Sequence, residues 1–533
     1  MVNLPEIGSE TARKYSIITI VVGKIPETEI KIPQYTATED TYMKRNIILW
    51  LLVCAMLSPT LASCGEKTLS ETTGTETTAE DTTATAETET EETRAMHKVP
   101  ESDFGGAGFH TLYPDWQGYK FYFFADEATG DAMNDAIYAR KIQVEEYTNT
   151  KITEENGGGI DNMEGKVKKT VQAGEDTYQQ VLLHCISGVA NLASGGFLYD
   201  YATLPYVDLS AEWWNQSATE QLRLGKKTYY AVSDYMIPCP YVIVFNKEIV
   251  RNNEMESPYE LVYSGEWTID KYIAMAEAAV RDVDGDGKYT EADIFGMTAN
   301  ESSKYIALMP ASDQFITEKG DDGRIRLAMN TEKTISLVEK VYAMSSKDGV
   351  VYRPANMELL TTDSMMMNGN VLFLLTAVSD IVNLRESEVD IGLLPYPKYD
   401  TAQESYLNMD WGGLAGIPTS IQNPEMVGAV VELLAYESGN TVIPAYYDVL
   451  LAGKLARDED STKMLDILFD TITYEIGGNY FGFSSGFNDL FYTLGNYVVI
   501  NGNSDFASLY AKNEKSAQQT IDKFYKALDE NEG

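Results

Sequence analysis

The residues best arranged for chemistry lie in one acidic loop, 282–293. Oxygen-bearing side chains occupy loop positions 1, 3, 5, 9 and 12: Asp282, Asp284, Asp286, Thr290 and Asp293. Gly287 stands at position 6, where such a loop turns sharply, and Lys288 at position 7 would contribute its backbone carbonyl. This is the spacing of an EF-hand calcium loop. We predict one structural Ca²⁺ ion here; the alternative is an ordinary Asx/Gly turn.

The sequence evidence for an enzyme is weaker than the evidence for a calcium loop. Segment 482–486 reads G-x-S-x-G, but a hydrolase of that type needs its histidine after the serine, and His97, His110 and His184 all precede Ser484. We expect this segment to be a loop facing a cleft. The spacing of His184, Cys185 and Cys239 matches no metal or thiol-catalysis motif. A glycoside hydrolase needs only two suitably separated carboxylates, and 81 acidic residues leave that alternative open.

Composition narrows the class of protein further. The 533 residues carry 41 Lys and Arg against 81 Asp and Glu, a formal net charge of −40. That charge repels phosphate backbones, so nucleic-acid binding is excluded as a main function. A hydrophobic content of 44% supports a sizeable core, and the length indicates two or more domains. The 35 Tyr and 6 Trp residues suit polar ligands that also have apolar faces, although we expect most of them to serve core and interface packing.

The N-terminal region has the pattern of an export signal. Met43-Lys44-Arg45 precedes the apolar run 47–57, which is too short to span a bilayer but typical of a signal peptide. Residues 61–65, Leu-Ala-Ser-Cys-Gly, resemble a bacterial lipobox. The resemblance implies a signal peptide over 43–63, lipidation of Cys64 and a place on the outer face of the cell membrane. Residues 1–42 are then a spurious upstream extension or a real extension that is cleaved.

Residues 64–100 contain the lipidated cysteine and a Thr/Glu-rich segment that is too polar to fold, so we predict a disordered tether. The remaining cysteines, Cys185 and Cys239, form at most one disulfide, and two free thiols are the alternative.

Beyond residue 100, strand and helix patterns alternate, which predicts an α/β fold with a parallel sheet. The expected strands are 119–124, 151–153, 178–185, 228–232, 241–247, 294–299, 371–375, 390–394 and 414–418. The expected helices are 133–147, 167–173, 268–281, 331–346, 424–437, 461–470 and 514–528.

Several stretches, in their order along the chain, resemble the extracellular solute-binding proteins of ABC importers, in the sugar-binding family that includes maltose-binding protein. The stretches are 201–215, 225–230, 242–247, 365–373, 391–395 and 413–418, followed by a tail from 443. The resemblance implies two lobes, each a mixed sheet flanked by helices, with a cleft between them. It assigns 101–241 plus 395–445 to the N-terminal lobe and 246–390 plus 450–533 to the C-terminal lobe. Crossings between the lobes are expected near 241–246, 390–396 and 444–450.

This resemblance implies a monomeric protein that is not an enzyme. It would capture a carbohydrate, in particular an oligosaccharide, by hinge closure and deliver it to a separate permease. A lipid-anchored glycoside hydrolase, a carbohydrate-adhesion protein and a binding protein for another polar solute remain alternatives.

Ligands of open α/β sheets lie beyond the carboxyl ends of the strands. This rule selects the whole segment 300–305. It also selects individual residues as ligand contacts: His184, Ser187, Asn191, Asp234, Tyr235, Tyr305 and Thr376. Asp410 and Trp411 precede a strand, and the ring of Trp411 could stack on a sugar. Trp213 is equally compatible with ligand contact and with core packing.

Overall fold

The computed structural model describes residues 95–116, 123–185, 187–299, 301, 303–353, 359–410, 412–450 and 458–532. The predicted signal peptide and Cys64 therefore lie outside the described residues, as does most of the tether. No helix in the described part of the chain combines the length and the apolar character needed to cross a bilayer.

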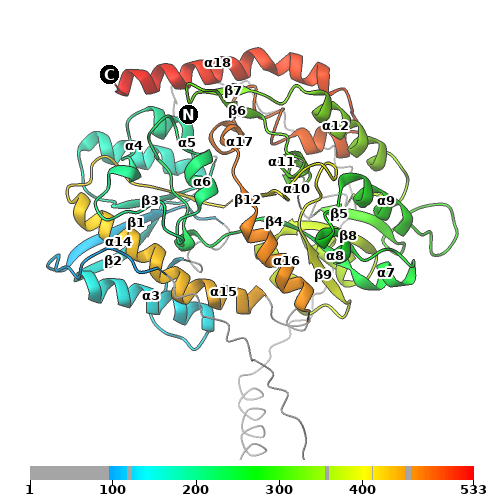
Figure 1. Cartoon of the computed structure of the whole chain (residues 1–533), viewed down its shortest axis with the longest axis horizontal. Helices are drawn as coiled ribbons and strands as arrows, with labels where there is room; N and C mark the ends of the chain where they lie inside the picture. The colour runs from blue at the N-terminus through cyan, green and yellow to red at the C-terminus, as the bar shows by residue number, and fades with distance from the viewer. Residues whose placement is uncertain are drawn as a thin grey trace, which may run out of the picture. The chain divides into compact units, whose positions relative to one another are not determined.

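Two four-stranded sheets form the frame of the folded body (Figure 1). The first has the order β11-β3-β1-β2, in which β1 runs parallel to β2 and β3 whereas β11 is antiparallel to β3. The second has the order β5-β8-β4-β9, in which β5 is parallel to β8 and β4 is antiparallel to both of its neighbours. We call the sheets with their covering helices the first and second lobes. Both sheets are mixed, as the resemblance implied, rather than purely parallel.

The first lobe combines the early part of the chain with a later return. Its elements are β1 (Ala107–Tyr113), α3 (Ala132–Thr148), β2 (Thr150–Asn156), α4 (Met163–Ala173), β3 (Gln180–Leu183), α5 (Val189–Ser194), α6 (Gln216–Gln221), β11 (Leu414–Gly416) and α14 (Pro424–Glu437). Helix α15 (Ile443–Leu450) follows and contacts α3. The boundaries of α14 follow from local chemistry, because Asn423 caps its first turn and Pro424 needs no hydrogen-bond partner there.

The second lobe is built from the middle of the chain and one later helix. Its elements are β4 (Tyr241–Asn246), α7 (Lys247–Asn252), α8 (Pro258–Tyr263), α9 (Ile269–Ala279), β5 (Phe295–Ala299), α10 (Ser303–Ile306), α11 (Leu308–Ala311), β6 (Thr317–Lys319), β7 (Ile325–Leu327), α12 (Glu332–Ser345), α13 (Leu359–Met367), β8 (Val371–Ala377), β9 (Ile391–Leu394) and α16 (Glu459–Asp470). Every residue of β4 and β8 is buried, which explains their continuous apolar sequences.

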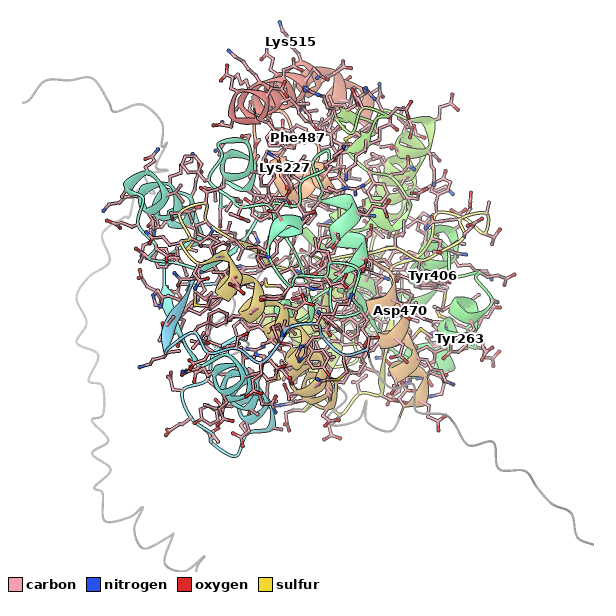
Figure 2. All side chains as sticks on the ribbon, turned by 60° about the vertical axis from the view of Figure 1, so that its left-hand side comes forward. Lys227, Tyr263, Tyr406, Asp470, Phe487 and Lys515 are labelled. Carbon is pink, nitrogen blue, oxygen red and sulfur yellow. The ribbon has the colours of Figure 1, made fainter. Side chains whose placement is uncertain are left out.

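The C-terminal segments join the two lobes. Strand β10 (Asn408–Met409) pairs in parallel with β12 (Ile472–Thr473), and α17 (Ile476–Phe481) packs on α5. Helix α18 (Phe506–Glu532) contacts α5 of the first lobe and both β7 and α12 of the second, and it extends over both lobes in Figure 1. Figure 2 shows Phe487 beneath α18, while Lys515 projects from its outer side.

Most of the expected elements are present, with two differences. The first strand is β1, at Ala107–Tyr113; of the predicted strand 119–124, only Phe123 and Phe124 are described, and neither is in a strand. The segment 228–232 forms an isolated bridge between Ala231 and Ala415 instead of a strand. Both segments carry β-forming residues, but strand formation also needs a partner in register, which the local sequence does not specify.

Candidate functional site

A cavity of about 220 Å³ lies between the two lobes. Its aromatic lining comes from Trp116, Phe123, Tyr241, Tyr446, Phe483 and Tyr492. Its polar lining comes from His184, Glu301, Ser303, Lys304, Ser379 and Asp380. Both lobes contribute, so a ligand in this cavity would contact both.

The first lobe presents an indole and an imidazole to the cavity. Trp116 follows β1 and His184 follows β3, two parallel neighbours whose carboxyl ends meet at one edge of the sheet. Their ring centroids lie 4.3 Å apart at an interplanar angle of 62°. Burial lowers the pKa of His184 to about 4, so the imidazole is neutral at neutral pH. This wall is therefore aromatic and uncharged.

The second lobe presents a buried lysine. Lys304 lies on the short helix α10, directly after β5, and is only 4% exposed. Its Nζ lies 4.1 Å from the centroid of the Tyr241 ring and donates to Oε2 of Glu301 over 3.4 Å. Burial lowers the pKa of Lys304, but the tyrosine ring and the carboxylates of Glu301 and Asp380 raise it more, so the net pKa is above the usual value. The ammonium is therefore charged.

Two carboxylates flank this lysine. Glu301 also accepts a hydrogen bond of 3.0 Å from Ser303, and its side chain is 47% exposed. Asp380 lies in the 3-10 helix η4 (Val378–Leu384), within 3.5 Å of the hydroxyls of Thr376 and Ser379. The wall formed by the second lobe therefore carries fixed donors and acceptors of both charges.

The structure brings His184 to the cavity and places other predicted ligand contacts elsewhere. Ser187 is buried in the turn after β3, where its Oγ accepts from the amide of His184. Asn191 lies on α5 and donates to Glu164 of α4. Thr376 is buried next to Asp380, behind the cavity wall, and Tyr305 is buried one residue beyond Lys304. None of these four belongs to the described cavity lining.

Trp213 and its neighbours lie in the core of the first lobe. The indole of Trp213 donates to one carboxylate oxygen of Glu432 over 3.0 Å, and the indole of Trp214 donates to the other over 2.8 Å. Tyr235 is buried with its ring 4.7 Å from the guanidinium carbon of Arg140. Asp234 begins the 3-10 helix η3 (Asp234–Met236) beside Trp213, to whose carbonyl its amide donates.

The segment around Asp410 lies between the lobes. Asp410 is buried and accepts from the Tyr474 hydroxyl and from the Gly412 amide. Trp411 lies outside the described residues, but Gly412 and Gly413 line the cavity. Cys185 and Cys239 are reduced thiols and form no disulfide with each other. Burial raises the pKa of Cys239 to about 11, so this cavity-lining thiol is neutral.

Sequence reasoning missed several cavity residues. Glu301 and Lys304 fall within the segment 300–305 selected by the strand-end rule, and Asp380 follows β8 in the same way. The rule identifies the segment but not the side chain that faces inward. Phe483, in the segment 482–486 expected to face a cleft, does line the cavity. No sequence pattern identified Trp116 as a cavity residue, because β1, the strand that precedes it, was not predicted.

The acidic loop of the second lobe brings three carboxylates together. Oxygen atoms of Asp282, Asp284 and Asp293 lie within 4.8 Å of one another. Asp293 also closes the loop by accepting from the amides of Val283 and Thr290, which lowers its pKa. The oxygen Oδ1 of Asp286 instead accepts from the Lys288 amide. Three converging carboxylates are a donor set that suits Ca²⁺.

Structural comparison identifies the class of fold. The ABC substrate-binding protein Lmo0181 from Listeria monocytogenes, in complex with cycloalternan, is 13% identical; the match covers 80% of this chain and 99% of that protein, with a TM-score of 0.51. A sugar transporter from Rhizobium etli in an open conformation is 13% identical over 80% of this chain and 99% of its own, with a TM-score of 0.53. UspC of M. tuberculosis matches at 13% identity over 77% of this chain and 99% of its own, with a TM-score of 0.53.

The chain therefore has the two-lobed fold of the solute-binding proteins, as the sequence resemblance implied. No protein-family model matches the sequence, and no curated protein matches it.

Proposed function

We propose that the protein captures a carbohydrate by closing its two lobes around it and delivers it to the permease of an ABC importer, without performing chemistry on it. The cavity between the lobes is the observation that supports this proposal. It combines aromatic rings, which pack on the C–H faces of sugars, with carboxylates, hydroxyls and an ammonium, which bind sugar hydroxyls. Two structural neighbours, a substrate-binding protein in complex with cycloalternan and a sugar transporter, agree with it.

The size of the cavity bears on the ligand. A volume of about 220 Å³ is below the roughly 300–1,000 Å³ of sites for drug-sized ligands. This conformation therefore suits a monosaccharide or disaccharide better than the longer oligosaccharide that the family resemblance implies.

We also propose that Cys64 carries a lipid that anchors the chain to the outer face of the membrane, with the Thr/Glu-rich segment as a tether. The lipobox-like sequence 61–65 supports this assignment. A Cys64→Ala variant should move the protein from the membrane fraction to the medium.

The acidic loop supports a further proposal, one structural Ca²⁺ bound by Asp282, Asp284 and Asp293, with Asp286, Thr290 and the Lys288 carbonyl completing the site. A bound Ca²⁺ would neutralise the mutual repulsion of these carboxylates. The loop is fixed to β8 because Asn370 donates to the backbone carbonyls of Glu291 and Asp293.

Thermal unfolding of the full chain, with and without a panel of mono- and disaccharides, tests the main proposal. A saturable rise in the unfolding temperature, with the sugar recovered intact, is expected. Since Glu301 and Asp380 place two carboxylates in one cavity, the recovered sugar should be analysed for hydrolysis. Cleaved sugar would favour the glycoside hydrolase instead, and no binding of any sugar would contradict carbohydrate capture.

A further inference from the structure

The charged groups of the cavity show an imbalance that bears on which saccharides it accepts. Among the described residues that line it, Lys304 is the only cation, whereas Glu301 and Asp380 are both carboxylates. His184 and Cys239, which also line it, are both neutral at neutral pH. The described lining therefore carries more negative than positive charge.

The surroundings of Lys304 hold its ammonium in one position, where it can bind a ligand. Its side chain is buried, its ammonium lies over the Tyr241 ring, and the carbonyl of Lys304 accepts from the Tyr396 hydroxyl, which fixes the backbone. The hydrogen bond from Nζ to Glu301 is 3.4 Å, which is long for a charge-assisted bond. Because the ammonium has three protons, it keeps donor capacity for a ligand. A buried ammonium with spare donors at a cavity wall is suited to a ligand acceptor.

A pair of sugar hydroxyls matches this arrangement. Each hydroxyl can accept one hydrogen bond and donate another. Adjacent hydroxyls can therefore accept from Nζ of Lys304 and donate to the carboxylates of Glu301 or Asp380. An uncharged diol can contact these groups and leave the ion pair between Lys304 and Glu301 intact. A carboxylate or phosphate on the ligand would compete with Glu301 for the lysine and would face both acidic side chains.

Building on the proposed function, we infer that Lys304, flanked by Glu301 and Asp380, makes the cleft selective for uncharged saccharides over uronates and sugar phosphates. Lys304 binds the sugar hydroxyls, and the two carboxylates supply both acceptors for those hydroxyls and repulsion against anionic sugars.

Calorimetric titration of the full chain with matched ligands tests this inference. The probes are glucose, galactose, mannose and their disaccharides, with glucuronate, galacturonate and glucose 6-phosphate as anionic counterparts. We expect a neutral saccharide to bind at least tenfold more tightly than its anionic counterpart. Tighter binding of an anionic form would overturn the inference and leave carbohydrate capture standing. Failure of every sugar to bind would overturn the proposed function, and this inference with it.

Variants of Lys304 and Glu301 provide a second test. Lys304→Met keeps an unbranched side chain, one atom shorter, and removes its charge, and we expect at least a tenfold loss of neutral-sugar affinity. Lys526→Met, at a 77% exposed position on α18, is the matched control and should bind as the parent does. Glu301→Gln should narrow the difference in affinity between neutral and anionic sugars. This measurement is independent of whether Lys304→Met folds, and an unchanged difference would overturn the inference.

Discussion

The hydroxyl of Tyr474 donates a 2.7 Å hydrogen bond to Oδ2 of Asp410, and both groups are buried. Asp410 also forms an isolated bridge with Pro240, next to the start of β4, and Tyr474 directly follows β12. Asp410 thus connects three segments that run between the lobes, through its carboxylate to Tyr474 and through its backbone to Pro240. A ligand-induced movement of the lobes would have to preserve or rearrange this contact.

Replacing Tyr474 by Phe should therefore lower the stability of the protein. The substitution removes the hydroxyl and leaves a buried carboxylate oxygen without that donor, which costs about 1–3 kcal/mol in the free energy of unfolding. Urea unfolding followed by fluorescence measures the change. Tyr263→Phe is the matched control, because the exposed Tyr263 donates to Asp460 and its loss should cost less than about 1 kcal/mol. Equal effects at both positions would contradict a special role for the buried pair.

Glu432 should give the protein a measurable pH dependence. Burial raises the pKa of Glu432 to about 7, although the indole donors of Trp214 and Trp213 oppose the shift. The unfolded chain has the lower, ordinary pKa, so between about pH 4.5 and 7 the folded state binds more protons. The contribution of Glu432 to the free energy of unfolding is therefore fully present below about pH 4.5. It is lost as the pH rises towards 7, by at most about 1.4 kcal/mol per pH unit.

Chemical unfolding at a series of pH values tests this dependence. The stability advantage of the parent over Glu432→Gln should shrink from pH 5 to pH 8. Glu339→Gln, at an exposed position on α12, is the control and should show no such trend. A difference that grows with pH would reverse the assigned sign.

Asp363 should be a position where loss of a carboxylate stabilises the fold. It is buried on α13, burial and the charge of Asp380 raise its pKa to about 6, and its contact with Asn383 is long, at 3.4 Å. Asp363→Asn removes the repulsion and the cost of burying the charge. We expect a higher unfolding temperature at pH 7.5 and a smaller gain at pH 5. An exposed substitution, Asp161→Asn, should change neither value, and destabilisation of Asp363→Asn at pH 7.5 would disprove the argument.

Calcium should raise the unfolding temperature of the full chain, because an ion that binds only the folded state stabilises it. Removal of the ion with a chelator should reverse the rise. Asp284→Asn should abolish most of the calcium effect, since it removes one of three converging carboxylates. Asp321→Asn, in the exposed turn after β6, should retain the full effect. An identical calcium response in both variants would exclude the loop as the binding site.

Aromatic residues of the cavity should contribute strongly to saccharide affinity. We expect Trp116→Ala to weaken binding about tenfold, which corresponds to about 1.4 kcal/mol, because a large flat contact surface is lost. Trp411→Ala should also weaken binding without unfolding the body, because Trp411 precedes two glycines of the cavity wall. Titration calorimetry measures both. Tyr263→Ala, an exposed aromatic position on α8, is the control; equal affinities for all three variants would contradict these contacts.

The sequence predicts well where local chemistry is decisive. Helix α14 has its predicted limits because Asn423, Pro424 and the following apolar periodicity act within a few residues. Strand β1 was missed because its sequence includes Gly108, His110 and Thr111, and its stability comes from pairing with β2 and β3, which are distant in sequence. Such pairing leaves little trace in the strand itself.

The same limit applies to the candidate site. The strand-end rule identifies the segment 300–305, yet the turn of α10 determines that Lys304 faces the cavity while Tyr305 is buried beyond its lining. For Trp213, the partner that holds it in the core is Glu432, more than 200 positions later. The direction of a side chain depends on such distant partners, so a single sequence does not specify it.

Helix α18 restricts how the lobes can move. Its 27 residues form a rod of about 40 Å. Near its end, Asn531 donates to the Ser194 carbonyl of the first lobe, while Asp529 pairs with Arg324 of the second. A continuous helix resists bending, so pulling the lobes apart at this face would break one set of these contacts. Rotation of one lobe about an axis close to α18 would preserve the contacts of Asn531 and Asp529. The lobes would then open by a twisting motion about this helix.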